Sequence, residues 1–144
     1  MDLVPRPEEA CRDILLSQLR DRLNTRGIDV QPEGRYADMK RADLRVSYTT
    51  PSISANVPIE IKRDSHADLW SAIQDQLIRR YTEGLETDGH GIYVVFWFGR
   101  HKIPASASGK KPTTAETLEQ QLLQSLTTEQ RQLISVVVFD CAAH

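Results

Sequence analysis

The chain has 144 residues, of which 40% are hydrophobic and 26% are charged, and this is the composition of an ordinary folded protein. The length fits one compact domain, which we expect to span residues 1–144, and is too short for two domains of usual size. The formal net charge of −2 argues against nonspecific nucleic-acid binding by the whole surface, although it leaves room for a local basic groove.

The apolar segments predict no membrane association. The longest of them, Ile92 to Phe98, is far shorter than the roughly 20 residues that a membrane-spanning helix requires. The N-terminus lacks the basic and apolar regions of a secretory signal, so a cytoplasmic location is expected. Cys11 and Cys141, at opposite ends of the chain, are expected to be reduced thiols in that compartment.

The first predicted element is a helix between Pro7 and Gly27. Pro7 suits the first turn of a helix, and Glu8 and Glu9 suit its positive N-terminal end. Gly27 supplies a stop signal. The apolar residues between them follow helical spacing: Ala10, Ile14, Leu15, Leu19 and Leu23.

Two strands and a turn are predicted next. Residues 42–48 alternate between polar and apolar side chains, as do residues 57–63, and the segment between them is typical of a turn. The pattern therefore indicates a β-hairpin. Residues 28–42, which precede it, are polar and turn-rich.

The second half of the chain alternates helices and strands. A helix is predicted within residues 66–85, with Asp64 and Ser65 as candidate caps. A buried strand, a loop, a helix and a last strand follow at residues 92–98, 99–114, 115–126 and 134–139. This order predicts an α/β protein with a mixed central sheet flanked by helices.

Charged residues on the predicted hairpin form the candidate site. The period of a strand places Glu60 and Lys62 on one face and Ile59 and Ile61 on the other. The hairpin would bring Asp43, at the start of the preceding strand, toward Glu60. Carboxylates suit Mg²⁺, and a lysine beside it can orient an attacking water and stabilise developing negative charge. These residue types fit phosphodiester hydrolysis, and the competing interpretation of the Glu60–Lys62 pair is a surface salt bridge of little energetic value.

The series Asp43…Glu60-Ile61-Lys62 resembles the D…(D/E)-X-K signature of the PD-(D/E)XK, or restriction-endonuclease-like, superfamily. The predicted order of elements also resembles the αβββαβ core of that superfamily. Two features depart from its pattern. Ala42 stands where the signature has proline, and Asp38 is a second candidate for the first carboxylate.

A second element of the sequence resembles RecB-like members of the superfamily. Gln76-Leu77 followed by Tyr81 is similar to their Q-L-x-x-x-Y element. The resemblance implies that Gln76 positions the attacking water or the scissile phosphate, and that Tyr81 supports the nucleic acid. The alternatives are a polar helix surface at Gln76 and an ordinary core tyrosine at Tyr81.

The resemblance also implies a metal site. Asp43, Glu60 and the backbone carbonyl of Ile61 would hold Mg²⁺, with Mn²⁺ as a substitute. Glu9 in the first helix, or Glu8 in its place, would complete the ligand set. Lys62 would orient the attacking water.

The implied activity is hydrolysis of phosphodiester bonds in DNA, with RNA as an alternative substrate. Lys102, Lys110 and Lys111 would contact the phosphate backbone, although such lysines more often belong to a solvated surface. The chain also resembles nuclease domains fitted to larger defence or mobile-element proteins. A domain of this size has little room for base-reading elements, so a homodimer or additional domains would supply the specificity.

Two other kinds of protein remain consistent with the sequence. One is a catalytically inactive domain of the same fold that binds nucleic acid or a protein partner. The other is a plain interaction module in which the Glu60–Lys62 pattern is a coincidence.

Overall fold

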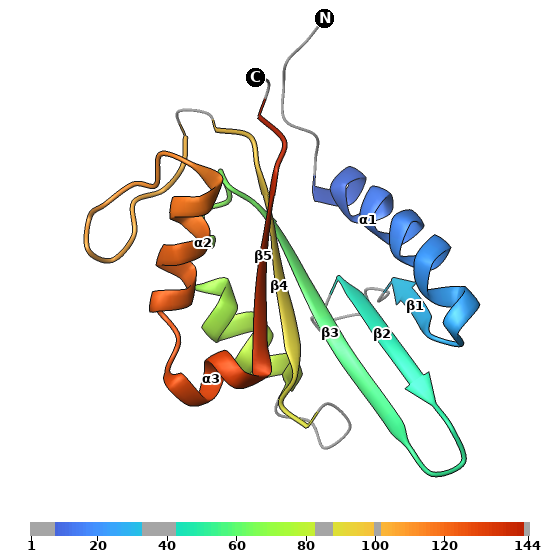
Figure 1. Cartoon of the computed structure of the whole chain (residues 1–144). Helices are drawn as coiled ribbons and strands as arrows, with labels where there is room; N and C mark the ends of the chain where they lie inside the picture. The colour runs from blue at the N-terminus through green and yellow to red at the C-terminus, as the bar shows by residue number, and fades with distance from the viewer. Residues whose placement is uncertain (1–7, 33–42, 83–87, 100–101, 143–144) are drawn as a thin grey trace, which may run out of the picture.

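The computed structural model describes residues 8–32, 43–82, 88–99 and 102–142 (Figure 1). In this part of the chain five strands form one mixed sheet in the order β1-β2-β3-β4-β5. The first three strands are antiparallel neighbours, and β4 and β5 continue the sheet in parallel with β3. The strands are β1 (Asp29–Pro32), β2 (Leu44–Thr49), β3 (Ser54–Arg63), β4 (Gly91–Trp97) and β5 (Ile134–Asp140).

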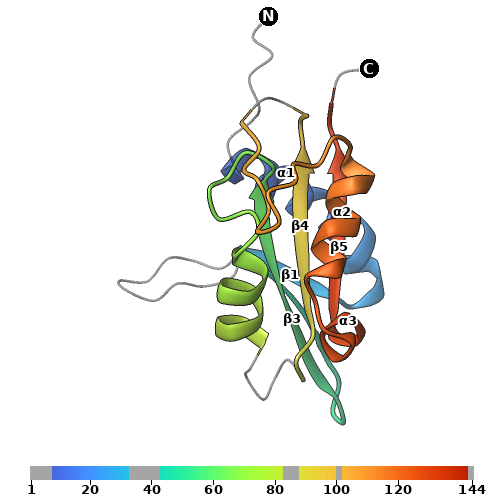
Figure 2. The ribbon, with the colours of Figure 1, turned by 90° about the vertical axis from the view of Figure 1, so that its left-hand side faces the viewer.

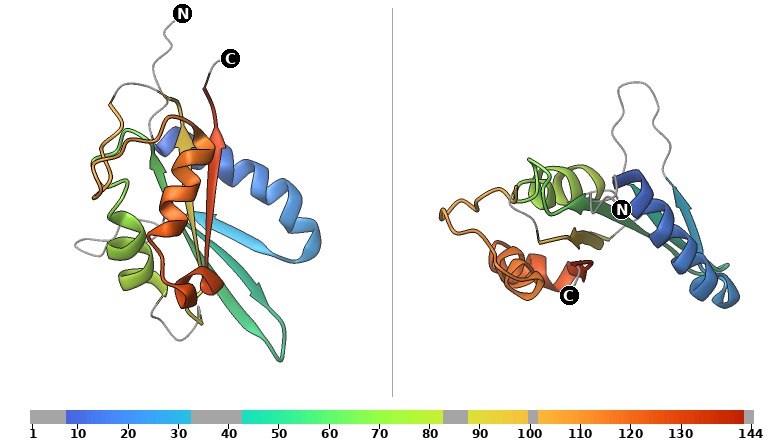
Figure 3. Two further views of the ribbon diagram at one scale, coloured as in Figure 1. Left: turned by 60° about the vertical axis from the view of Figure 1, so that its left-hand side comes forward. Right: turned by 90° about the horizontal axis from the view of Figure 1, so that it is seen from above.

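Helices lie on both faces of the sheet, which confirms the predicted α/β class (Figures 2 and 3). One face carries α1 (Glu8–Leu23), which is followed by the short helix η1 (Asn24–Arg26). The other face carries the π-helix η2 (Ile73–Thr82), α2 (Ala115–Gln124) and α3 (Thr128–Leu133). None of the described helices is long and apolar enough to cross a membrane.

The inner strand β4 lies between the two clusters of the apolar core. Tyr93 and Val95 point to the face under η2 and α2, whereas Val94 and Phe96 point to the face under α1. Because both faces of β4 are covered, its sequence is a continuous apolar run rather than an alternating one, as predicted. In the α1 cluster these residues pack with Cys11, Leu15, Leu44, Ile59 and Ile61.

The predicted hairpin is confirmed, but its turn is shorter than the sequence indicated, because β2 continues to Thr49 and β3 already begins at Ser54. The turn is confined to residues 50–53, where Thr50 Oγ1 accepts a hydrogen bond from the Ile53 amide at 3.0 Å. The pairing consequently continues outward to Thr49 opposite Ser54. The edge strand β1 was not predicted, because Val30 is its one buried apolar residue and its stability comes from tertiary contacts. One of these is the bond from Arg20 Nε to the Val30 carbonyl at 3.0 Å.

The helix predicted after Asp64 begins later than expected. Residues 64–71 form turns, and the regular part of η2 starts at Ile73. Asp64 does not cap this helix, because its carboxylate accepts hydrogen bonds from the amides of Phe98 and Gly99 at 2.8 and 2.9 Å. The carboxylate therefore joins the end of β3 to the end of β4. The short helix α3 was also not predicted.

Candidate functional site

Two charged residues of β3 point into the interior between the sheet and η2. Glu60 and Lys62 lie beside Tyr93 and Val95 in the parallel pairing with β4, and therefore share their face of the sheet. Only 3% of Glu60 and 6% of Lys62 is exposed to solvent. The alternation predicted from Glu60-Ile61-Lys62 is confirmed, but both charged residues are buried rather than placed on a solvated surface.

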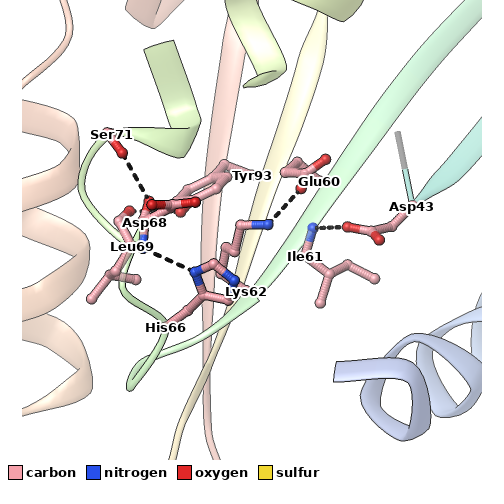
Figure 4. A network of polar contacts seen from close by, with 9 residues as sticks. All are labelled: Asp43, Glu60, Ile61, Lys62, His66, Asp68, Leu69, Ser71 and Tyr93. Carbon is pink, nitrogen blue, oxygen red and sulfur yellow. Dashed lines mark hydrogen bonds and ion pairs between the residues drawn. The ribbon is translucent and has the colours of Figure 1, made fainter. Parts of the chain in front are cut away.

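The two buried groups form an ion pair. Lys62 Nζ donates to Glu60 Oε1 at 2.8 Å (Figure 4). The other oxygen of the same carboxylate, Glu60 Oε2, is buried and has no hydrogen-bond partner among the described residues. A buried polar atom without a partner costs about 1–3 kcal/mol. The carboxylate therefore has an acceptor position that no described residue uses.

Asp43 lies beside β3, on the side of β2, and immediately precedes the first residue of β2. Its Oδ2 accepts a hydrogen bond from the backbone amide of Ile61 at 2.8 Å (Figure 4). The ladder between the two strands ends one residue later along β2, at Leu44 opposite Ile59. Since the amide and carbonyl of one strand residue point to the same side, the Ile61 carbonyl also points toward the Asp43 side of β3.

The electrostatics of the site disfavour ionisation of Glu60. The pKa of Glu60 is raised from 4.5 to about 7, chiefly because burial penalises the charged form and also because the negative charge of Asp43 lies nearby. The ammonium group of Lys62 opposes this shift and lowers the pKa without cancelling it. Glu60 and Asp43 are therefore close enough to repel each other, and a cation between them would relieve the repulsion.

The donor set fits a magnesium ion in its chemistry. Two carboxylates, one of them with an unused oxygen, and a backbone carbonyl are the hard oxygen ligands that Mg²⁺ prefers. The described residues contain no group of three or more His, Cys, Asp or Glu side chains that could hold a metal ion. Glu9, exposed at the start of α1, is accordingly not assembled with Asp43 and Glu60.

All three residues of the Q-L-x-x-x-Y element lie in η2, the helix that covers the Glu60–Lys62 face of β3. Gln76 is half-buried and precedes Leu77, which is fully buried in the core, and Tyr81 lies one turn further along. A neighbouring glutamine of η2, Gln74, exchanges two side-chain hydrogen bonds with Gln130 of α3, at 3.0 and 3.2 Å. Their bonds fix η2 against α3.

The predicted lysines occupy the connection between β4 and α2. Lys102, Lys110 and Lys111 are all exposed there. Trp70 Nε1, from the segment before η2, donates to the Pro104 carbonyl at 2.8 Å and anchors this connection beside η2. Of the other candidates, Asp38 lies outside the described residues, and Glu8 is the first residue of α1.

Sequence reasoning did not assign a role to Tyr93, which is fully buried on the same face as Glu60. Its hydroxyl donates to the Leu69 carbonyl at 2.6 Å and so ties the turns before η2 to the sheet (Figure 4). The sequence did contain a signal for this role, because Tyr93 is a tyrosine within an apolar strand. A buried tyrosine hydroxyl needs a hydrogen-bond partner. His66 accepts from the Asp68 amide at 2.9 Å in these turns.

A family model described as a domain of unknown function (DUF8371) matches residues 2–100. The chain belongs to the DUF8371 family. The match covers the site residues Asp43, Glu60, Lys62 and Gln76, whereas α2, α3 and β5 follow it in the chain. No curated protein and no solved structure matches the chain.

Proposed function

We propose that this DUF8371 protein is a Mg²⁺-dependent nuclease of the PD-(D/E)XK type that hydrolyses phosphodiester bonds in DNA. The observation that carries the proposal is the buried Glu60–Lys62 pair of β3 with the half-buried carboxylate of Asp43 beside it. The element order α1-β1-β2-β3-η2-β4 supports it, because it is the helix, three strands, helix and strand of the αβββαβ core.

The cost of burying this set argues for a function. Replacing a buried ion pair by apolar residues is often neutral or stabilises a protein by about 1–4 kcal/mol. The Glu60–Lys62 pair is nearly inaccessible to solvent, and one Glu60 oxygen has no hydrogen-bond partner in the part of the chain that the structure describes. Packing alone does not require such a pair, whereas a hydrolytic site for a phosphodiester does.

Each residue has a role in this proposal. Asp43 and Glu60, with the Ile61 carbonyl, would hold Mg²⁺, which when bound polarises the phosphate and makes a water easier to deprotonate. The hydrogen bond to Glu60 positions the ammonium group of Lys62, which would orient the attacking water and stabilise negative charge on the phosphate. Gln76 positions the water or the phosphate from η2.

The substrate contacts are part of the same proposal. Exposed Lys102, Lys110 and Lys111 contact the phosphate backbone from the connection beside η2. Because a domain of this size has little room for base-reading elements, it would serve as the effector part of a larger defence or mobile-element system. The second candidate is a binding module without activity, which the absence of a third side-chain metal ligand among the described residues favours.

The test is cleavage of supercoiled plasmid, single-stranded DNA and RNA with Mg²⁺, with Mn²⁺ and with chelator. We expect metal-dependent cutting of DNA that Asp43→Asn abolishes. Asp75→Asn, which changes an exposed carboxylate of η2, is the matched control and should cut at the wild-type rate. Failure of the wild type to cut any of the three substrates would favour the binding module instead.

A further inference from the structure

The two edges of the sheet differ in how they are protected. β1 is a four-residue strand that contains Asp29 and Pro32, and short strands with charges or proline discourage pairing with another chain. β5 has seven residues, Ile-Ser-Val-Val-Val-Phe-Asp, and carries no charge before Asp140. Among the described residues β5 pairs only with β4, so its other edge offers backbone donors and acceptors along an uncharged, β-branched strand.

One face of β5 is also incompletely covered. α2 and α3 pack against the side that carries Val136 and Val138, whereas α1 packs against β1 and β3 on the opposite side of the sheet (Figure 3). Phe139 on that opposite side is 40% exposed, although its ring lies 5.5 Å from the ring of Phe96. Val137 on the same side is half-buried. An apolar strip thus adjoins the open edge.

We infer that β5 is the interface of a homodimer, in which the β5 strands of two copies pair antiparallel about a two-fold axis at Val137. The five-stranded sheets of both copies then form one continuous sheet. In this register Val137 faces its own equivalent, Val136 faces Val138 of the second copy, and Ser135 faces Phe139 of the second copy. The smaller serine leaves room for the phenyl ring.

The absence of charge on residues 134–139 of β5 fits a second copy of this chain as the partner that pairs with its open edge. A two-fold interface sets each residue of one copy against the same surface of the other, so a charged strand would repel itself. Residues 134–139 contain no charge and are self-compatible. They also lack the lysines and arginines that a nucleic-acid backbone would require. An antiparallel strand pair gives both copies identical hydrogen bonds.

Disulfide trapping tests the register directly. The background variant Cys141→Ser removes the exposed native thiol, and Cys11 is buried. Opposite residues of an antiparallel pair have Cα atoms about 4.5–5.5 Å apart, within the range of a disulfide. Val137→Cys should therefore give a covalent dimer on mild oxidation. Ser135→Cys is the control, because its two copies would lie about 13 Å apart and should stay unlinked.

Sedimentation analysis tests the dimer without a cross-link. At concentrations up to about 100 µM, a dissociation constant in the micromolar range would populate a wild-type dimer. Val137→Lys should sediment as a monomer, whereas Ile53→Lys, which places the same charge on an exposed apolar residue of the β2–β3 turn, should remain a dimer. A monomeric wild type, equal cross-linking of Ser135→Cys, or a dimer that persists in Val137→Lys would overturn the inference.

The dimer stands independently of the proposed function, because the β5 edge contains none of the residues that carry the site. Its failure would leave the nuclease proposal unchanged, and a protein that dimerises without cutting would leave the interface unchanged. If both hold, the dimer carries two sites, one for each strand of a duplex.

Discussion

The two faces of β3 contain neighbouring residues that are almost equally buried and opposite in chemistry. On the α1 side, Ile59 and Ile61 are 2% and 1% exposed and pack among aliphatic and aromatic neighbours. On the η2 side, Glu60 and Lys62 are 3% and 6% exposed and pair with each other. Burial of the isoleucines stabilises the fold, whereas burial of the charges costs free energy. The difference teaches that the same strand packs the core with one face and holds a buried ion pair with the other.

The largest expected effect is a difference in stability between variants of the apolar face and variants of the polar face of β3. Ile61→Ala should lower the free energy of unfolding by about 2–5 kcal/mol, because it leaves a cavity in a packed core. The double variant Glu60→Leu with Lys62→Met, which replaces the ion pair by apolar side chains, should be as stable as the wild type or more stable by up to about 4 kcal/mol. Urea unfolding at neutral pH in chelator measures both. A double variant as unstable as Ile61→Ala would mean that the polar face is structural.

The pH dependence of stability should reveal the ionisation of Glu60. The folded-state pKa, about 7, lies above the unfolded value of 4.5, so the folded protein binds the proton more tightly. The stabilisation is therefore complete below pH 4.5 and is lost as the pH rises through 7, by about 3 kcal/mol in total.

The measurement is metal-free urea unfolding from pH 4.5 to pH 8, with Glu60→Gln as the reference. The free energy of unfolding of the wild type should fall relative to that of the variant over this interval. Parallel curves for the two proteins would show that Glu60 has an ordinary pKa.

Asp43 allows a finer separation of structure from chemistry at one residue. Asp43→Ala should lower the free energy of unfolding by about 1–3 kcal/mol, because the amide of Ile61 loses its acceptor. Asp43→Asn retains an acceptor oxygen and should keep most of this stability while losing the negative charge. If thermal unfolding shows equal losses in both variants, the charge rather than the hydrogen bond fixes Asp43.

The smallest effect on the free energy of unfolding is expected for the contact between η2 and α3. A double-mutant cycle of Gln74→Ala and Gln130→Ala should give a coupling free energy of about 1 kcal/mol, as for two ordinary hydrogen bonds. Gln76→Ala should leave stability nearly unchanged and slow DNA cleavage instead. A large coupling with no effect of Gln76→Ala on cleavage would limit η2 to a structural role.

The sequence predicted the parts of the fold that follow from periodicity. Alternation around Glu60 and Lys62 identified β3 and its two faces, and the apolar run at residues 92–98 identified β4. The strand β1 was missed because it contains little apolar pattern and depends on pairing with β2 and on Arg20. Asp64 was assigned to a helix cap, since sequence spacing alone cannot show that the amides of Phe98 and Gly99 lie beside it.

The candidate site was predictable only in part. The hairpin placed Asp43 near Glu60, and the structure brings the two together with Ile61 and Lys62. Their burial did not follow from the sequence, because it depends on the turns at 64–71, which the hydroxyl of Tyr93 holds against the sheet. Glu9 was suggested by its place in the first helix, but the described residues do not group it with the two carboxylates.

The most direct test of the nuclease proposal is the rate at which Lys62→Ala nicks supercoiled plasmid in Mg²⁺, compared with the wild type. A loss of about 100-fold or more is predicted, the magnitude expected when a group that stabilises developing charge is removed. Arg79→Ala, which removes an exposed cation of η2, should retain the wild-type rate. Nicking by Lys62→Ala at the wild-type rate would contradict the assignment of the site.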